Sequence, residues 1–192
     1  MEIKERIQKR SRLLNENIDQ MIDDIFKISE LIVDSIKNRR KIMFCGNGGS
    51  AAESQHMAAE YCATLNHKNF RSGIPAISLT VDTSFLTAWT NDFNYSEVFS
   101  RQIETLGQEN DVLMCYSTSG TSTNIVEAAK MAKSMGIKVI LFTGKNKDLP
   151  IKDYCDYIMH APSLKTAIIQ EFHTIIGHEV CMNVENELFS FK

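Results

Sequence analysis

The sequence predicts an α/β protein built on a parallel sheet, and two observations carry that prediction. From residue 42 onward, apolar runs of strand length alternate with segments of helical period, which is typical of a parallel sheet covered by helices on both faces. Two of these runs end in loops rich in glycine or hydroxyl side chains, at 46–50 and 117–123. Because ligands of such sheets bind beyond the C-terminal ends of the strands, we expect function in these two loops.

Each element has its own signal in the sequence. Isoleucines at three- and four-residue steps predict a helical leader over 3–37. Short apolar runs predict the strands, and Gly136 ends one of the intervening helices as a C-terminal glycine. The expected strands are 42–45, 75–79, 111–116, 137–142 and 157–159, and the expected helices are 50–65, 96–106, one that runs to 135, and 164–188.

The composition limits the class of protein. A chain of 192 residues, 43% hydrophobic and 23% charged, fits one domain over 1–192, with a leading helical segment at 1–37 and a core at 40–192. The net charge of −3 gives no basic field to attract nucleic acid or anionic lipid. No run of 18 apolar residues occurs, so we expect no membrane-spanning helix.

The cysteines and the start of the chain indicate a cytoplasmic protein. There are five cysteines, an odd number without a C-x-x-C pair, and most lie in apolar runs. We therefore expect reduced core residues and no disulfides. The first ten residues lack the apolar centre of a signal peptide.

The loop at 46–50 predicts an anion site between a strand and a helix. Its glycines leave backbone N–H groups bare at a helix start, and Ser50 with Glu53 forms a capping box for that helix. The same letters fit the dinucleotide fingerprint G-x-G-x-x-A, which expects an acidic residue about 20 positions later. Residues 66–72 offer none, and a tight turn without a ligand stays open as an alternative.

The loop at 117–123 contains six hydroxyl residues and one glycine. Hydroxyls together with the N–H groups of a helix start hold a phosphate well without any lysine. A simple helix cap is the alternative, but six hydroxyls are more than a cap needs. The absence of a G-x-x-x-x-G-K-[ST] pattern argues against an ATPase or a kinase.

Candidate proton-transfer and metal-binding side chains lie on two predicted helices. His56 and Glu60 share one helix face at i and i+4, a spacing that also suits an ordinary surface pair. On the last helix, His178 lies eight residues from Gln170, roughly 12 Å along a straight helix. Spacing leaves open whether these residues bind one ion within a chain or complete a site between subunits. Asn91-Asp92 lies in a stretch without regular period, which we interpret as a loop that binds a sugar or caps the following residues.

These motifs together resemble a known family. The matching positions, which run from about residue 40 to 182, are 45–52, 55–60, 91–92, 97–102, Gly107, 111–113, 117–120, Ser122, 141–145, 169–171, His173 and His178. In this order they resemble the SIS (sugar isomerase) family, and within it the phosphoheptose isomerases. The resemblance implies a flavodoxin-like three-layer α/β/α sandwich, with a five-stranded parallel sheet and long N- and C-terminal helices.

The resemblance also implies an activity and a set of site residues. The activity is conversion of sedoheptulose 7-phosphate to D-glycero-D-manno-heptose 7-phosphate through an enediol, which supplies heptose for lipopolysaccharide or capsule, by a homotetramer with active sites at subunit interfaces. Glu60 and His178 match the acid/base pair, and His56, Glu60, Gln170 and His178 match the ligands of one zinc ion per subunit. The positions that match substrate contacts are Asn47, Gly48, Gly49, Ser50, Asn91, Asp92, Ser117, Thr118, Ser119, Ser122 and Gln170.

Two departures from the family pattern keep the substrate open. Residues 63–65 read Ala-Thr-Leu where the family often has Gly-Arg and an aromatic, so a basic contact is lost that Lys68 or Arg71 replaces only in part. Thr121 stands where the family usually has asparagine. The alternatives are an isomerase of another phosphosugar and a non-catalytic regulator of replication initiation, although such regulators lack the full set of two histidines, glutamate and glutamine.

Overall fold

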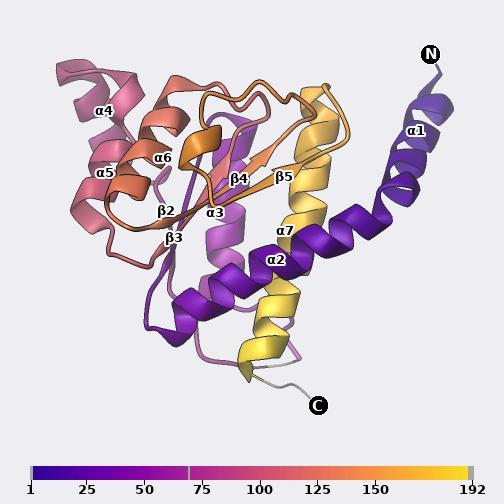
Figure 1. Ribbon diagram of the computed structural model, residues 1–192, viewed down its shortest axis with the longest axis horizontal. Coiled ribbons are helices and arrows are strands. Elements are labelled where there is room, and N and C mark those ends of the chain that lie inside the picture. Colours follow the sequence, from indigo (N-terminus) through magenta and orange to yellow (C-terminus); the bar gives the residue numbers. More distant parts are fainter. Residues whose placement is uncertain (1, 69, 190–192) are drawn as a thin grey trace.

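The protein folds around one five-stranded parallel sheet. The computed structural model, which describes residues 2–68 and 70–189, gives the strand order β2-β1-β3-β4-β5 (Figure 1). Gly46 at the end of β1 pairs with Tyr116 at the end of β3. The loops 46–50 and 117–123 therefore leave the sheet side by side, at the C-terminal ends of the strands. The strands are β1 (Ile42–Gly46), β2 (Ala76–Ser78), β3 (Val112–Tyr116), β4 (Lys138–Thr143) and β5 (Tyr157–His160).

The apolar runs form central strands because both of their faces are covered. Every residue of β1 and of β3 is buried. Side chains alternate between the faces: Ile42 and Phe44 enter one apolar cluster, and Met43 and Cys45 enter the other. Two hydrophobic cores therefore sandwich the sheet.

Helices cover the sheet on both faces, which confirms the predicted three-layer α/β/α architecture. The first cluster is closed by α2, α3 and α7, and the second chiefly by α5 and α6, with α4 at its margin. In Figure 1 the two helical layers lie on opposite sides of the strands. The helices are α2 (Ile18–Lys37), α3 (Gly49–Cys62), α7 (Thr166–Phe189), α4 (Thr83–Asp92), α5 (Ser100–Leu106) and α6 (Thr123–Ser134).

The leading segment is two helices, although the isoleucine pattern predicts one helical region. α1 (Ile3–Glu16) ends at Asn17, whose backbone leaves helical geometry (φ −120°, ψ 15°). The Asn17 side-chain amide donates to the carbonyl of Leu13 at 2.7 Å and so closes the end of α1. α2 packs along α7, whereas α1 buries no residue and projects from the body of the molecule (Figure 1).

The stretch that contains Asn91-Asp92 is a helix, so its interpretation as a loop was wrong. The Asp82 side chain accepts a hydrogen bond from the Phe85 N–H at 2.9 Å and caps the start of α4. The signal was missed because an exposed helix has no need of an apolar face with a period of 3.6 residues. The helix expected at 96–106 is a 3₁₀ turn, η1 (Tyr95–Glu97), followed by α5, and a second 3₁₀ turn, η2 (Lys152–Tyr154), precedes β5.

Within the described residues, no helix combines the length and the apolar character that crossing a membrane requires.

Candidate active site

The helix after the glycine loop begins before Ser50, so the predicted capping box of Ser50 and Glu53 was wrong. α3 begins at Gly49 and its N-cap is Gly48, whose φ of 54° lies in the left-handed region that glycine tolerates. Ser50 therefore sits inside the first turn and does not cap the helix. Glu53 does not complete a capping box, because its carboxylate instead accepts a hydrogen bond from the Thr174 hydroxyl at 2.8 Å.

α3 and α7 lie side by side and run in the same direction. A Cβ on Gly49 would lie 2.6 Å from the Gln170 amide nitrogen, and farther along the pair Glu53 meets Thr174. Gly49 faces Gln170 and Glu53 faces Thr174, so the residue numbers of facing positions differ by 121 at both places. A constant difference means that the two helices are parallel. We call this contact the α3–α7 seam. It carries side chains from two segments more than a hundred residues apart into one row.

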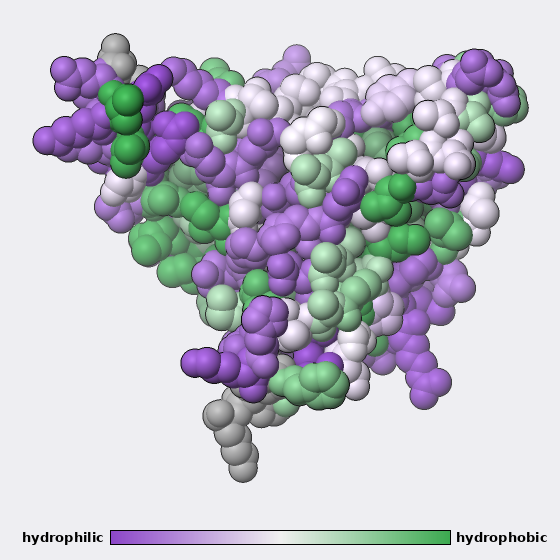
Figure 2. Space-filling model, turned by 180° about the vertical axis from the view of Figure 1, so that it is seen from behind, coloured by the Kyte–Doolittle hydropathy of each residue, from purple (hydrophilic) through white to green (hydrophobic). Residues whose placement is uncertain are grey.

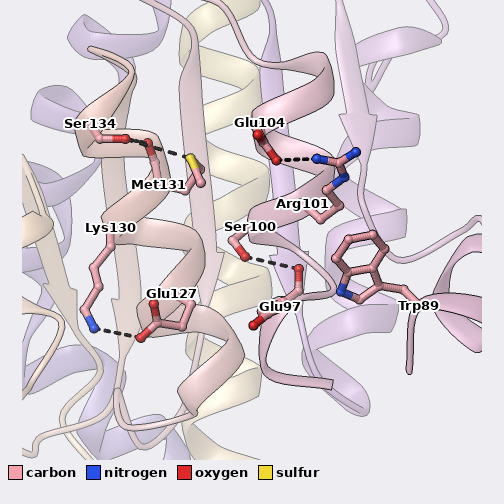
Figure 3. A pocket seen from close by; sticks show the side chains of 9 residues that line it. All are labelled: Trp89, Glu97, Ser100, Arg101, Glu104, Glu127, Lys130, Met131 and Ser134. Atoms are coloured by element: carbon pink, nitrogen blue, oxygen red, sulfur yellow. Dashed lines mark hydrogen bonds and ion pairs between the residues drawn. The ribbon is translucent and has the colours of Figure 1, made fainter. Parts of the chain in front are cut away.

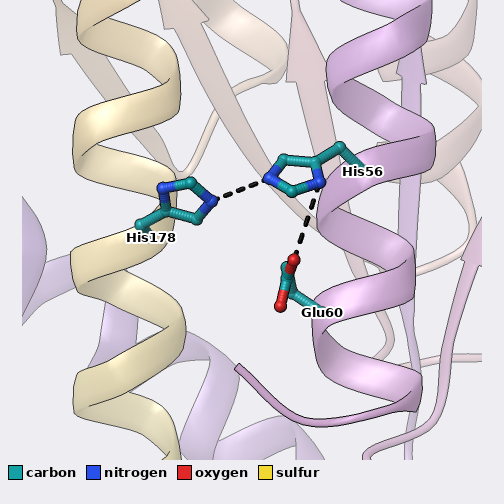
Figure 4. A group of neighbouring side chains, drawn as sticks. All are labelled: His56, Glu60 and His178. Atoms are coloured by element: carbon teal, nitrogen blue, oxygen red, sulfur yellow. Dashed lines mark hydrogen bonds and ion pairs between the residues drawn. The ribbon is translucent and has the colours of Figure 1, made fainter. Parts of the chain in front are cut away.

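Three predicted ligands meet on the seam. His56 Nε2 lies 2.7 Å from His178 Nε2, and His56 Nδ1 lies 3.6 Å from Glu60 Oε1 (Figure 4). One ligand atom from each residue can be chosen so that all three lie within 4.8 Å of one another. The His56 and Glu60 side chains are 42% and 21% exposed, so the cluster is open to solvent and to a ligand. His56 and Glu60 therefore have His178 from α7 as a third neighbour.

Gln170 lies apart from these three residues. Its amide packs against Gly49 at the start of the seam, and His178 is eight residues farther along α7, roughly 12 Å by helix rise. It borders a cavity of about 320 Å³ with Glu53 and His173, and a second cavity of about 220 Å³. Within one chain the structure brings together three of the four predicted zinc ligands and leaves the fourth two turns away.

The hydroxyl loop and the glycine loop share the second cavity. Asn47, Gly49 and Ser50 line it from one side, and Ser117, Thr118 and Ser122 line it from the other. Ser122 is the N-cap of α6, yet its hydroxyl makes no capping bond, which leaves that hydroxyl available to a ligand. Ser119 is exposed, and its hydroxyl accepts hydrogen bonds from the backbone and side chain of Thr121.

Asn91 and Asp92 are exposed at the end of α4, where the Asn91 amide donates to the Asp92 carboxylate at 2.8 Å. They line neither of the two cavities beside the seam. The next segment reaches the site instead, through the Tyr95 hydroxyl, which donates to Asn47 Oδ1 at 2.8 Å. Sequence reasoning missed Tyr95, because no local pattern marks a hydrogen bond between distant segments.

A larger cavity, of about 440 Å³, opens on the opposite helical layer (Figure 3). Four of its five charged side chains pair on their own helices, Arg101 with Glu104 and Lys130 with Glu127, both at 2.7 Å. The fifth, Glu97, accepts a hydrogen bond from the Asn94 amide at 3.0 Å. It receives neither strand-end loop and no member of the histidine cluster. We therefore place the candidate active site along the seam, despite the greater volume of this cavity.

Comparison with known proteins agrees with the geometry. The family model described as SIS domain matches residues 7–144. The chain belongs to the SIS domain family, among the phosphoheptose isomerases. It is 45% identical to the phosphoheptose isomerase of Clostridium acetobutylicum over 191 residues, with 100% of this chain and 95% of the relative covered. It is 47% identical to that of Nitratiruptor over 161 residues, with 84% of each chain covered.

Solved structures give the same family. The phosphoheptose isomerase of Neisseria gonorrhoeae superposes with a TM-score of 0.88 at 35% identity, covering 96% of this chain and 97% of that one. The phosphoheptose isomerase of Francisella tularensis gives a TM-score of 0.90 at 29% identity, with 96% of each chain covered. The whole SIS domain described above, including the seam, is thus shared with enzymes that carry the name isomerase.

Burial shifts the pKa of three side chains beneath this SIS domain site. Burial lowers the pKa of His173 to about 4, so its imidazole is neutral at physiological pH, and its ring packs against Tyr116 at 5.6 Å. Burial raises the pKa of Tyr116 well above its usual value, and its hydroxyl has no hydrogen-bond partner among the described residues. Burial also raises the pKa of Glu53, one of whose oxygens is buried without a partner.

Arg71 does not supply the basic contact that the family arginine suggests. It is buried, and its Nε donates to Glu185 on α7 at 2.7 Å. Its two terminal nitrogens donate to the carbonyls of Glu60 and Tyr61, each at 2.9 Å, and so close the last turn of α3. In this member of the SIS domain family, Arg71 supports the backbone of Glu60, and its guanidinium is used in bonds within the protein and not in contact with a ligand. Lys68 is exposed in the loop that follows α3.

Proposed function

We propose that this chain is an aldose–ketose isomerase that converts sedoheptulose 7-phosphate to D-glycero-D-manno-heptose 7-phosphate and supplies heptose for cell-surface polysaccharide. The observation that carries the proposal is the meeting of His56, Glu60 and His178 on the α3–α7 seam. The cavity between the two strand-end loops lies at the start of the same two helices. The names of relatives that match nearly the whole chain support the same reaction.

The two loops divide the recognition of the sugar phosphate. Asn47, Gly48, Gly49 and Ser50 contact the sugar with amide and backbone groups. Residues 117–119 and Ser122 hold the phosphate with hydroxyls and with the N–H groups at the start of α6. Holding the far end of the substrate fixes the position of its carbonyl end, which lowers the entropic part of the barrier.

We further propose that one zinc ion binds in each subunit. Two imidazoles and one carboxylate are a donor set of catalytic zinc sites, which keep an additional position open. His56 Nε2 and His178 Nε2 lie 2.7 Å apart, and one ligand atom from each of the three residues can be chosen so that all lie within 4.8 Å of one another. Tetrahedral ligands at zinc distances of about 2.0 Å lie roughly 3.3 Å apart, so small side-chain movements would bring the three donors to one ion. When bound, zinc supplies a Lewis acid beside the carbonyl oxygen. Gln170, from this chain after rearrangement or from another subunit, would be the fourth ligand.

Glu60 and His178 move the protons in this proposal. The Glu60 carboxylate takes a proton from C1 of the ketose and returns it to C2, while His178 gives a proton to O2 and accepts the proton from O1. The intermediate between these transfers is the enediol, and no atom is gained or lost. Glu60 can take the proton only while its carboxylate is free of the metal, so its backbone support by Arg71 helps to hold it near the substrate.

We propose a homotetramer with active sites at subunit interfaces. α1 buries no residue, and a lone helix of 14 residues is marginal in water. Large apolar side chains are exposed at helical spacing, and Figure 2 displays apolar residues gathered on the side from which α1 projects. A second copy of the chain is the occupant that would cover them, and sedimentation should give four times 21.8 kDa; a monomer would contradict this. The exposed residues are Ile3, Ile7, Ile18, Ile22 and Phe26.

The proposal includes a cytoplasmic location. Cys45 and Cys115 lie with their sulfurs 3.6 Å apart, and both are free thiols. Two free thiols this close together are expected in a reducing compartment, where thiols stay reduced. Fractionation of cells that express the tagged protein should place it with cytoplasmic enzymes, and recovery outside the cytoplasm would contradict the proposal.

The deciding experiment is relative turnover across a panel of ketose phosphates with five, six and seven carbons. We expect sedoheptulose 7-phosphate to give the highest kcat/KM. A higher value for a pentose or hexose phosphate would keep the reaction type and change the substrate. No turnover with any of them would contradict an isomerase and favour a binding protein such as a regulator of replication initiation.

Elemental analysis tests the metal separately. Protein purified without chelator should contain about one zinc per chain, and His56→Ala should lose it because the variant lacks one of the two imidazole donors of the site. His67→Ala is the matched control, since His67 is exposed in the loop after α3. Zinc that stays in the His56→Ala protein would exclude this cluster as its site.

A further inference from the structure

The side-chain amide of Asn47 is fixed from two sides. Asn47 Nδ2 donates to Oδ1 of Asn124 at 2.9 Å, and Asn124 Nδ2 donates back to Oδ1 of Asn47 at 2.8 Å. The Tyr95 hydroxyl donates to the same Asn47 oxygen at 2.8 Å. Segments from three separate parts of the chain therefore meet at one amide.

This arrangement decides what Asn47 can offer to a ligand. An asparagine side chain has two N–H donors and two acceptor lone pairs. Asn124 and Tyr95 occupy both lone pairs of the Asn47 oxygen, and Asn124 also takes one of its N–H groups. One N–H remains, on a side chain that lines the cavity between the two loops. Asn47 can therefore only donate, and its partner must be an oxygen.

Of the two residues that hold Asn47, one is buried and the other is exposed to solvent. Asn124 is 3% exposed and lies in the first turn of α6, directly after the hydroxyl loop. Tyr95 is 50% exposed and lies in η1, beyond the helix that buries no residue. The reciprocal amide pair ties the glycine loop to the helix that follows the hydroxyl loop, and Tyr95 closes the amide from the solvent side.

We propose that Asn124 and Tyr95 are positioning residues for Asn47. They orient its amide so that the remaining N–H donates to a hydroxyl or carbonyl oxygen of the sugar phosphate held between the two loops. The identity of that ligand rests on the proposed function. The hydrogen-bonded arrangement itself exists without a ligand and can be tested without one. Each residue acts through Asn47 and not through the proton-transfer cluster.

Removing one hydroxyl is the mildest test. Tyr95→Phe should raise KM for sedoheptulose 7-phosphate about 2- to 10-fold, the worth of one net hydrogen bond, and should change kcat by less than about twofold. KM responds because Asn47 binds the ground state and the transition state alike. Tyr154→Phe removes a hydroxyl in η2 that lines neither cavity beside the seam, and it should change neither constant. A Tyr95→Phe enzyme with an unchanged KM would overturn the role of Tyr95.

A double-mutant cycle tests whether Tyr95 works through Asn47. In an Asn47→Ala background, adding Tyr95→Phe should change kcat/KM by less than about 1.5-fold, because coupled residues are not additive. The same fold loss in both backgrounds would overturn the proposal. Asn124→Asp should raise KM more than Tyr95→Phe does, since a carboxylate cannot donate to the Asn47 oxygen and repels it.

A measurement without substrate separates this proposal from the proposed function. In protein with ¹⁵N-labelled asparagine, the Nδ2 signal of Asn47 is the one that disappears in Asn47→Ala. Tyr95→Phe should shift this signal and leave that of Asn183, on α7, in place. If the wild-type protein fails to isomerise sedoheptulose 7-phosphate, the proposed function fails while this signal still reports the arrangement. An unmoved Asn47 signal would overturn the positioning role whatever the activity.

Discussion

The α3–α7 seam and the α4–η1 segment, residues 83–97, both carry predicted site residues, but they hold them in opposite ways. On the seam, a Cβ on Gly177 would lie 2.8 Å from the Met57 sulfur, so the helices are in close contact beside the histidine cluster. α4 buries no residue, and Asn91 and Asp92 point into solvent. The seam residues His56, Glu60 and His178 meet across two helices of one chain, whereas Asn91 and Asp92 on α4 bond only to each other.

The largest effect should come from the seam. Glu60→Gln should lower kcat by about 10²- to 10⁴-fold, the usual contribution of a general base, with substrate binding retained in calorimetry. Glu187→Gln, the same change at an exposed position near the end of α7, should leave kcat unchanged. Near-normal turnover by Glu60→Gln would show that the seam positions this carboxylate for some purpose other than proton transfer.

The buried ion pair between Arg71 and Glu185 should have the largest effect on the free energy of unfolding. Arg71→Leu leaves the buried Glu185 carboxylate without its ion-pair partner, with only the Leu65 N–H still donating to it, and should cost about 3–5 kcal/mol in urea unfolding. Adding Glu185→Leu should recover much of that loss, because the uncompensated charge is then removed. Arg101→Leu breaks an exposed ion pair beside the α4 segment and should cost less than about 1 kcal/mol. Equal losses for the two arginines would contradict the contrast between the regions.

The buried floor of the seam should give a pH dependence. The folded pKa of His173 is about 4 and its ordinary value is about 6.5. Between these values the unfolded chain binds a proton that the folded chain does not, so stability falls as pH decreases. The fall should be about 2 kcal/mol between pH 6.5 and 5. His173→Asn should reduce this slope by that amount, and an unchanged slope would mean that His173 is not buried as a neutral imidazole.

The α4 residues should show the smallest effect on stability and a modest one on activity. Asn91→Ala and Asp92→Ala should each change the free energy of unfolding by less than about 0.5 kcal/mol. If they reach a substrate or a neighbouring subunit's site, each should lower kcat/KM by roughly 10-fold, the upper worth of one hydrogen bond. Full activity in both variants would remove α4 from the site and leave Tyr95 as the contribution of this segment.

Much of this contrast was open to prediction from the sequence, because sheets and strand-end loops have local patterns. The apolar runs predicted every strand, and the composition of 46–50 and 117–123 marked the loops that share a cavity. Helical spacing put His56 and Glu60 on one face. Spacing did not reveal His178 beside them, because the register between two helices is set by packing, here by the close approach at Gly177.

Other features lay beyond sequence reasoning for physical reasons. Ser50 looks like an N-cap, but the positive φ of Gly48 lets the helix begin earlier. Gln170 has the right residue type for a ligand, and its distance of two turns from His178 follows from helix spacing alone, but its position beside Gly49 follows from the parallel register of the seam. Tyr95 and Asn124 act through hydrogen bonds between distant segments, and such bonds leave no periodic signal along the chain.

The parallel direction of α3 and α7 has an electrostatic consequence. The cavity between the loops is lined by Gly49, Ser122 and Thr166, at the starts of α3, α6 and α7. Each helix dipole places about half a positive charge at its start, so three of them offer about 1.5 charges in a cavity that no lysine or arginine of residues 2–68 and 70–189 lines. Parallel neighbouring dipoles repel each other, and an anion at their common end offsets that repulsion. A phosphate bound there would therefore also serve as a counter-ion of the fold.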